Sequence, residues 1–460
     1  MAPSPESFIA RSARDETRRL LRLAVPVAGT QLSMMLLGFV DTVMLGWYDT
    51  DAMAASVSAN VWTYATMFFA SGVLLGLDPV IAQAHGAGDG DRAARAFQRG
   101  TIMSVVFAVP VALSWAWTGR FLSLTGQAEA LVPLAQDYAD ALLPGLPALL
   151  VYGCLRSYLQ GREIVRPALI IVLVANVINA GVNYVLIFGH FGFPELGIVG
   201  AGLASSATRI ASLILLAAWV WGFRLHRDAW VPWSMDVFRW RGMRTILVIG
   251  FPVAIQTSTE MFAFSASTLL AGTLGPTAVV AHAIALNLAS ISFMLPLGVS
   301  VAAATRVGNL IGAGALGGAQ RAAWIAIGMG ASVMSISAVS FVVFREWLPR
   351  IYTPNPESIA LAATILPIAG AFQLFDGTQA VSCGVLRGMG RTRPAAVFNV
   401  LGYWVLALPL GWWFGVRAGW LPGLWWGLAL GLAVVAVCLV VWIRVRGPGA
   451  LRPGERVVAE

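Results

Sequence analysis

The stretch LLRLAVPVAGTQLSMMLLGFVDTVMLGW, residues 20–47, holds only two ionisable side chains, Arg22 and Asp41. A run of this length exceeds the roughly 20 residues that a helix needs to cross the hydrocarbon core of a bilayer. It lacks a small-residue cleavage site and is too long for the apolar core of a signal peptide, so we expect it to stay in the mature chain. The stretch therefore predicts a membrane-spanning helix.

Further apolar runs follow the first one along the whole chain. Of the 460 residues, 58% are apolar and 11% are charged, and the mean hydropathy is +0.76. A soluble protein carries roughly 25% charged residues, so this chain has too little charge to cover a globule in water. We predict an all-α membrane protein of about twelve spans. After the first, we place them near residues 52–84, 97–118, 134–155, 167–189, 197–222, 245–272, 276–304, 322–344, 358–386, 394–416 and 420–443.

The distribution of positive charge predicts the orientation. All thirty basic residues are Arg, and twenty-five of them fall on one side of the predicted membrane, in both terminal segments and in alternate loops. The other side carries four, and Arg209 lies within a span. Because Arg-rich loops stay on the cytoplasmic side, we expect a plasma (inner) membrane protein with both termini in the cytoplasm. This distribution accounts for the net charge of +8 without a nucleic-acid partner.

The two halves of the sequence repeat each other at an offset of 226 residues. Matched positions include Pro26 with Pro252, Gly46 with Gly272, Gly72 with Gly298, Gly86 with Gly312, and Arg95 with Arg321. Each repeat holds an even number of spans, so the copies are parallel and related by an axis along the membrane normal. We predict an N-lobe over residues 1–235 and a C-lobe over 236–460, joined by a linker (223–244) long enough to let the lobes move.

Five segments carry a family resemblance. They are GFVDTVMLG (38–46), PVIAQAHGAGD (79–89), GFPVAIQTSTEMFAF (250–264), TRVGNLIGAG (305–314) and FDGTQAVSCGVLRGMGRTRP (375–394). In order and spacing they resemble the multidrug and toxic compound extrusion (MATE) family, within it the NorM-like branch, over nearly the whole chain.

The resemblance implies a fold and an activity. The fold is two six-helix lobes that form a V around a central cavity. The activity is multidrug efflux, which contributes to antibiotic resistance. Such an antiporter exports small organic compounds, mostly cations, by alternating access, coupled to inward flow of Na⁺ or H⁺. The resemblance implies no cofactor and no enzymatic activity, and we expect a monomer in the lipid bilayer.

An ionisable side chain within a span is costly, so each one is a candidate for function. Asp41 lies in the first span, and Asn176, Asn179 and Asn183 form a stripe at helical spacing on the fifth. In NorM-like proteins the Asp of the DT motif faces such Asn residues inside the N-lobe. The resemblance therefore implies cation or proton coupling at Asp41, with the three Asn as polar partners. The alternative is that the Asn stripe only joins helices by hydrogen bonds.

The seventh and tenth spans contain Glu260 and Asp376, where NorM-like exporters place the acids of a C-lobe cation site. Gln256, Phe372 and Gln379 lie near them in sequence as supporting residues. Some relatives carry Tyr where this chain has Phe372, so one oxygen ligand for Na⁺ is missing. Glu260 and Asp376 still form a possible Na⁺ site. Because the Tyr oxygen is absent, the sequence leaves Na⁺ and H⁺ open as the coupling ion. The alternative is that both acids are buried and protonated without a role in transport.

The acids do not follow the repeat. Met34 stands at the repeat position of Glu260, and Ser267 stands at that of Asp41. A residue needed only for packing should tend to appear in both copies, so we infer that the two lobes have different chemical tasks. Asp78, which we expect to reach headgroup water at the end of its span, has no assigned role, and neither has Arg209.

Two other functions compete with cation export. A lipid-linked oligosaccharide flippase of the same superfamily binds phosphate-bearing substrates and should have a basic cavity. Here three intramembrane acids, Asp41, Glu260 and Asp376, stand against Arg209 alone. An intramembrane enzyme such as a prenyl transferase needs clustered acids or a metal set. The close pair Asp49 and Asp51 lies on an outer loop, which disfavours the enzyme.

The charge asymmetry generates a prediction on topology. A cysteine that replaces Asp51, with Cys154, Cys383 and Cys438 removed, should react with an impermeant thiol reagent in intact cells, because the loop 46–51 is expected to face outward. Protection in intact cells, with labelling only after lysis, would reverse the predicted orientation.

Overall fold

The computed structural model describes residues 12–452, so Arg11 and Arg456 of the charge pattern lie outside the described residues. Twelve helical segments within that range are long and apolar enough to cross a membrane, and they match the predicted spans one for one. Their helices are α1 (Ala13–Tyr48), α2 (Thr50–Leu74) with α3 (Leu77–Gly86), α4 (Gly90–Trp115), α6 (Leu131–Leu142) with α7 (Leu146–Gly161), α8 (Arg166–Phe188), α9 (Gly197–Gly222), α10 (Trp240–Gly272), α11 (Pro276–Gly312), α12 (Leu316–Val343), α13 (Pro356–Gly388), α14 (Arg393–Val400) with α15 (Leu408–Gly411), and α16 (Leu421–Arg446).

Local chemistry explains where several helices begin. The side chains of Ser12, Asp49 and Asp89 accept hydrogen bonds from the first-turn amides of α1, α2 and α4, which satisfies donors that a helix start leaves free. The second span is broken at residues 75–76, between α2 and α3. In the eleventh span π-helical turns cover 401–407 and 412–416. A short helix, α5 (Thr118–Leu124), precedes α6.

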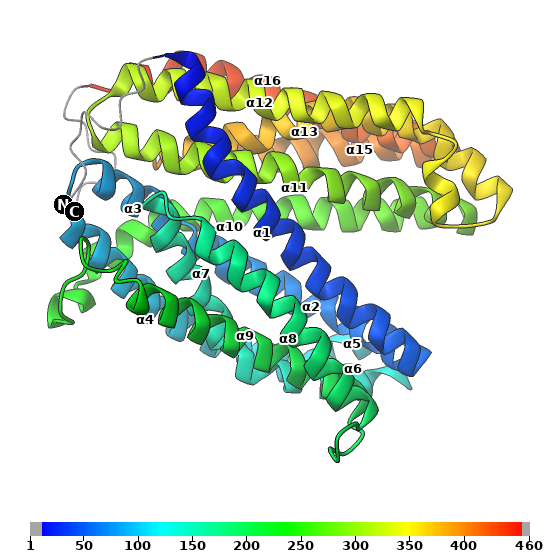
Figure 1. The fold of residues 1–460 in the computed structure, drawn as a ribbon. Helices are drawn as coiled ribbons and strands as arrows, with labels where there is room; N and C mark the ends of the chain where they lie inside the picture. The colour runs from blue at the N-terminus through cyan, green and yellow to red at the C-terminus, as the bar shows by residue number, and fades with distance from the viewer. Residues whose placement is uncertain (1–11, 453–460) are drawn as a thin grey trace.

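The repeat is visible in the helix boundaries. The second span, Thr50–Gly86, and α11, Pro276–Gly312, have the same length and the same 226-residue offset that the sequence shows. The two sets of six spans form two lobes arranged as a V (Figure 1). The lobes converge at the end where α1 begins and α16 ends, which we call the arginine-rich end, and they diverge toward the opposite end.

Glycines on α2 and α11 make the lobe contact close, and they do so symmetrically. A Cβ atom on Gly72 would lie 2.7 Å from the Cα atom of Ala254 on α10. Its repeat partner Gly298 would bring a Cβ atom 2.7 Å from the backbone nitrogen of Ala28 on α1. Because Ala28 and Ala254 are themselves related by the 226-residue offset, the same packing occurs twice about one pseudo-twofold axis.

A second symmetric pair of glycine contacts lies nearer the arginine-rich end. Gly86 packs against the backbone of Asn309, and its repeat partner Gly312 packs against the backbone of Gln83. Gln83 and Asn309 are again related by the same offset. Neither contact leaves space for a Cβ atom, so these glycines set how closely α3 and α11 approach.

The first helix of each lobe packs into the core of the other lobe. Leu20 and Val27 of α1 belong to an apolar cluster with Val307 of α11 and other C-lobe residues. In return, Ile249 of α10 lies in the N-lobe cluster with Ile81 of α3. The lobes are therefore interlocked at the arginine-rich end through α1 and α10.

A buried ion-pair network joins the lobes at the same end. Arg306 of α11 is fully buried, and its Nε and Nη2 atoms donate to the carboxylate of Glu16 on α1 at 2.6 and 2.9 Å. Its Nη1 atom lies 3.5 Å from Glu163 in the turn between α7 and α8, and Asn309 Nδ2 donates to the same carboxylate at 2.9 Å. Glu163 has a left-handed backbone with φ of 62°. That conformation is costly outside glycine, so its two partners help to hold it.

The predicted linker is not a free tether. Tyr158 of α7 donates to the carbonyl of Ala229 at 2.7 Å, and Gln98 of α4 donates to that of Val231 at 2.8 Å. The segment between α9 and α10 is thus attached to the N-lobe at Ala229 and Val231. The division of the chain at residues 235 and 236 stays a prediction.

The glycine contacts predict a stability difference between two substitutions. Gly312→Ala should lower the stability of the purified protein by about 1–3 kcal/mol, because the added methyl group meets the backbone of Gln83. Gly317→Ala, near the same end, meets nothing within 4 Å and should leave stability unchanged or slightly raised. Thermal unfolding in detergent compares them, and equal midpoints would show that the contact is not close-packed.

Candidate functional site

Asp41 is buried and has hydrogen-bond donors on both carboxylate oxygens. Asn183 of α8 donates from Nδ2 to Oδ1 at 2.6 Å, and the hydroxyl of Ser205 on α9 donates to Oδ2 at 2.7 Å. Asn183 also donates to Oδ1 of Asn179 at 3.2 Å. Asp41, Asn179 and Asn183 therefore form one connected polar cluster within the N-lobe.

Asn176, the third member of the stripe, has a different neighbour. Its Nδ2 atom donates to the backbone carbonyl of Ser33 on α1 at 3.0 Å and to that of Val172 in its own helix at 2.8 Å. Asn176 thus joins α8 to α1, which is the helix-joining role that we weighed for the whole stripe.

Ser205 is a member of the Asp41 cluster that the sequence analysis missed. Ser205, Thr208 and Ser212 are all buried and recur at helical spacing along one face of α9. That periodic polar face was the available signal. It could not show which neighbouring helix would use it.

Glu260 and Asp376 lie together in the C-lobe. Asp376 is buried on α13, Glu260 is half-buried on α10, and the two carboxyl groups are close enough to interact electrostatically. Gln379 hydrogen-bonds to Glu260. Among the described residues, no donor is placed on Oδ1 of Asp376. Glu260 and Asp376 therefore form one acidic pair, and one buried oxygen of Asp376 has no hydrogen-bond partner among the described residues.

The polar surroundings of Glu260 extend over three helices. Gln379 Nε2 donates to Oδ1 of Asn399 on α14 at 2.6 Å. Asn399 Nδ2 donates to Cys383 Sγ at 3.7 Å, and Gln256 hydrogen-bonds to the same sulfur. Gln256 and Gln379 therefore belong to one network, which includes the buried thiol of Cys383.

Aromatic rings cover the same site. Phe372 is almost fully buried, with its ring centroid 6.0 Å from that of Phe264 and 5.9 Å from that of Trp425. Tyr403 is also fully buried, 5.8 Å from Phe264 between ring centroids, and close enough to both carboxyl groups to interact electrostatically. A phenol is therefore present beside the site, although position 372 carries none.

Tyr403 was missed from the sequence, yet the repeat held a signal. The alignment that pairs Pro167 with Pro394 places Tyr403 opposite Asn176. Among the residues that the structure describes, none is placed to hydrogen-bond with the Tyr403 hydroxyl. Its oxygen is thus a further candidate contact for whatever occupies the acidic pair.

The two charged residues without an assigned role have different surroundings. Asp78 is buried, with Oδ2 3.5 Å from Nε of Arg387 on α13, so it joins the lobes instead of reaching headgroup water as we expected. Arg209 is half-buried beside Gly145, where its charge acts on Asp41.

Twelve spans in two parallel repeats, with carboxylates held inside each lobe, are typical of membrane transporters. The family model MatE matches residues 26–185 and 252–413, once in each repeat. The chain therefore belongs to the MATE family, a family of multi-pass membrane transporters and not of enzymes.

Individual relatives are similar in sequence to this protein over most of the chain. Multidrug resistance protein MdtK of Yersinia pestis (strain Pestoides F) is 34% identical over 436 residues, which cover 93% of this chain and 95% of that protein. The probable multidrug resistance protein NorM of Burkholderia pseudomallei (strain K96243) is 36% identical over 452 residues, or 96% and 94% of the two chains.

Solved structures show the same fold. The eukaryotic MATE transporter AtDTX14 superposes with a TM-score of 0.87 at 22% identity and covers 95% of this chain and 97% of its own. A MATE family transporter described as an outward-facing conformation gives a TM-score of 0.85 at 18% identity, over 95% and 96%. At these identities the likeness supports the twelve-helix V and nothing finer.

Proposed function

We propose that this chain exports small organic compounds, mostly cations, in exchange for inward Na⁺ or H⁺. The observation that carries the proposal is the pair of the half-buried Glu260 and the buried Asp376, two carboxyl groups in electrostatic contact inside one lobe. Two such groups repel each other unless a proton or a cation lies between them. A cationic substrate and a coupling ion can therefore compete for the same negative charge.

That competition is a means of coupling. When an ion neutralises the pair, a cationic substrate no longer experiences the full attraction, and it is released. Thermodynamic linkage requires the substrate to weaken ion binding by the same factor. The phenol of Tyr403 lies near both carboxyl groups, and carboxyl and phenol oxygens are ligands that a hard ion such as Na⁺ can use.

Asp41 supplies a second negative charge, in the other lobe. Its donors Asn183 and Ser205 stabilise the ionised form, and they come from helices α8 and α9. A proton or cation that reaches Asp41 alters those two contacts and so the packing of α1 against both helices. We assign Asp41 to ion or proton coupling in the N-lobe.

Alternating access requires the V to open at one end and close at the other. In the conformation described here, Arg306 with its partners Glu16 and Glu163 closes the arginine-rich end. We propose that this end faces the cytoplasm of a bacterial cell and that the chain acts as a monomer in the inner membrane. Opening inward then requires Arg306 to separate from Glu16.

Intramembrane charge also bears on the substrate. Asp41, Glu260 and Asp376 outnumber Arg209, which favours cationic over phosphate-bearing cargo. The relatives named above are multidrug resistance proteins, and a broad range of organic cations, antibiotics among them, is the corresponding substrate class for this chain.

Efflux of a cationic dye, with the Na⁺ gradient and pH varied independently, tests the function and the role of Asp41. Dye should leave cells faster when one of the two gradients is imposed. Asp41→Asn should slow efflux about tenfold or more, since the interactions of a buried charge are lost, and Ser205→Ala should slow it less. Asp140→Asn, an exposed acid, is the matched control. Efflux indifferent to both gradients would refute coupling, and normal efflux by Asp41→Asn at equal expression would leave that residue a structural role.

The acidic pair predicts a non-additive pattern. Glu260→Gln and Asp376→Asn should each impair export, and the double variant should be little worse than the worse single one, because the site fails once either acid is gone. In purified protein, raising the coupling ion should weaken dye binding, and each substitution should flatten that dependence. Glu357→Gln, on the exposed first turn of α13, is the control. Additive losses, with ion dependence intact in both single variants, would show that the acids do not share a site.

A further inference from the structure

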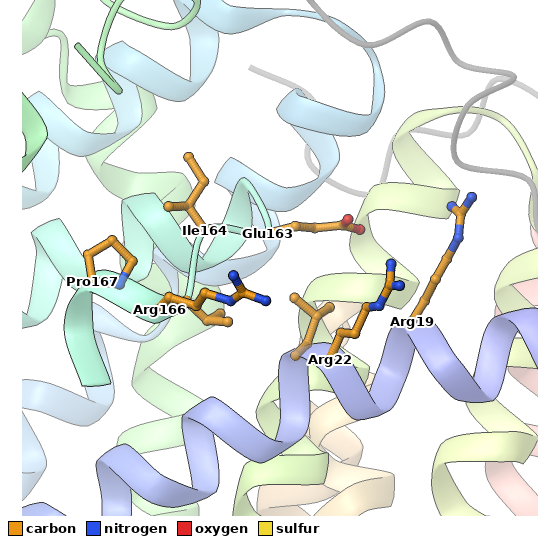
Figure 2. Close-up of a pocket in the computed structure, with 8 residues that line it drawn as sticks. Arg19, Arg22, Glu163, Ile164, Arg166 and Pro167 are labelled. Atoms are coloured by element: carbon orange, nitrogen blue, oxygen red, sulfur yellow. The ribbon is translucent and has the colours of Figure 1, made fainter. Parts of the chain in front are cut away.

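A basic pocket lies at the arginine-rich end, outside the site described above. It has a volume of about 650 Å³ and lies between the first turns of α1 and the turn that leads into α8. Arg19 and Arg22 line it from α1, and Arg166 and Glu163 line it from the other side. In Figure 2, Arg166 extends toward α1, while Arg19 and Arg22 stand along α1 across the pocket.

We expect both sides of the pocket to lie at a similar depth in the membrane. Arg22 is the last charged residue before the uncharged run 23–40 on α1, and Arg166 is the last before the uncharged run 167–189 on α8. The helices continue beyond these arginines to Tyr48 on α1 and to Phe188 on α8, far enough to cross the hydrocarbon core. The two guanidinium groups therefore lie at the level of lipid headgroups.

Exposed aliphatic side chains continue below both arginines. Val25, three residues after Arg22, is 64% exposed, and Ile170, four residues after Arg166, is 42% exposed. Spacings of three and four place each of them on the same helical face as its arginine, one turn deeper in the membrane. Each arginine thus has an apolar surface directly beneath it.

Glu163 does not cancel the positive charge of the pocket. Its carboxylate is engaged by Asn309 at 2.9 Å and by Arg306 at 3.5 Å, both on α11 of the C-lobe. Arg22 and Arg166 alone outnumber this one acid in the lining of the pocket. The first turn of α8, which begins at Arg166, adds the positive end of its helix dipole.

We propose that this pocket binds the headgroup of an anionic phospholipid. The lipid phosphate lies between Arg22 and Arg166, with Arg19 contributing to the field, and an acyl chain lies over Val25 and Ile170. Guanidinium groups suit phosphate because they donate two parallel hydrogen bonds. A free phosphate has the same headgroup chemistry and no use for the aliphatic surface, which is why we assign the pocket to a lipid.

Binding to the purified, delipidated full chain tests the proposal. The probes are dioctanoyl phosphatidylglycerol, dioctanoyl phosphatidylcholine, glycerol 3-phosphate and inorganic phosphate, each titrated in detergent with thermophoresis as the readout. Phosphatidylglycerol should bind tightest. Arg22→Gln and Arg166→Gln should each weaken it about fivefold, and together about 25-fold, the amount expected for juxtamembrane arginines near anionic lipid.

Control variants distinguish specific binding in the pocket from nonspecific electrostatic attraction of anionic lipid. Arg444→Gln with Arg446→Gln removes the same charge from exposed positions at the end of α16 and should change affinity less than about twofold. Equal losses in both double variants would overturn the proposal in favour of diffuse electrostatics. Inorganic phosphate that binds as tightly as phosphatidylglycerol, with the same dependence on Arg22 and Arg166, would replace the lipid by a free anion.

Two features keep the result interpretable. If the double glutamine variant does not fold, the single variants still carry the fivefold expectation, and Arg22→Lys with Arg166→Lys should retain most of the affinity. The measurement needs no transport, so it stands or falls separately from the proposed export.

Discussion

A charge buried in a membrane protein must be met by an opposite charge or by hydrogen bonds, because hydrocarbon supplies neither. The fully buried Arg306 shows what this constraint achieves here. Its guanidinium group requires Glu16 from the start of the chain and Glu163 from the α7–α8 turn. Three segments far apart in sequence are therefore held at one point. The convergence of the lobes at that end, and hence their divergence at the other, depends on this contact and on the glycines that let the helices approach it.

The same constraint explains why the repeat preserves shape without preserving chemistry. Where the N-lobe has Asp41, the C-lobe has Ser267, whose hydroxyl lies 3.3 Å from Nε2 of the buried His282. Where the C-lobe has Glu260, the N-lobe has Met34, whose sulfur lies 3.3 Å from Nη1 of Arg156. At both repeat positions, the residue that replaces the acid has a polar contact within its own lobe. Each half could therefore acquire its own acids while the paired glycine contacts kept the common frame.

Properties of a single stretch of chain, such as its apolar length, could be predicted from the sequence. Contacts between neighbouring helices could not. Apolar length gave the twelve spans, and the constant offset gave the repeat, because each is a property of the chain alone. The Asp41–Asn183 contact was within reach through the family resemblance. Ser205 and Tyr403 carried a signal in the polar face of α9 and in the repeat, but the sequence could not show which helices pack against them. Asp78 was misread for the same reason, because its partner lies about three hundred residues away.

The exchange of first helices between the lobes has a consequence for how the chain is made. Leu20 and Val27 of α1 are covered by α11, around Val307, so the earliest apolar segment lacks its final partner until well over half of the protein has been synthesised. Domains usually fold in the order in which they emerge. Here the N-lobe cannot complete its packing alone, and α1 must remain in the bilayer with one face against lipid until the second half arrives. The two halves therefore complete their folding together, although each half carries its own copy of the repeat.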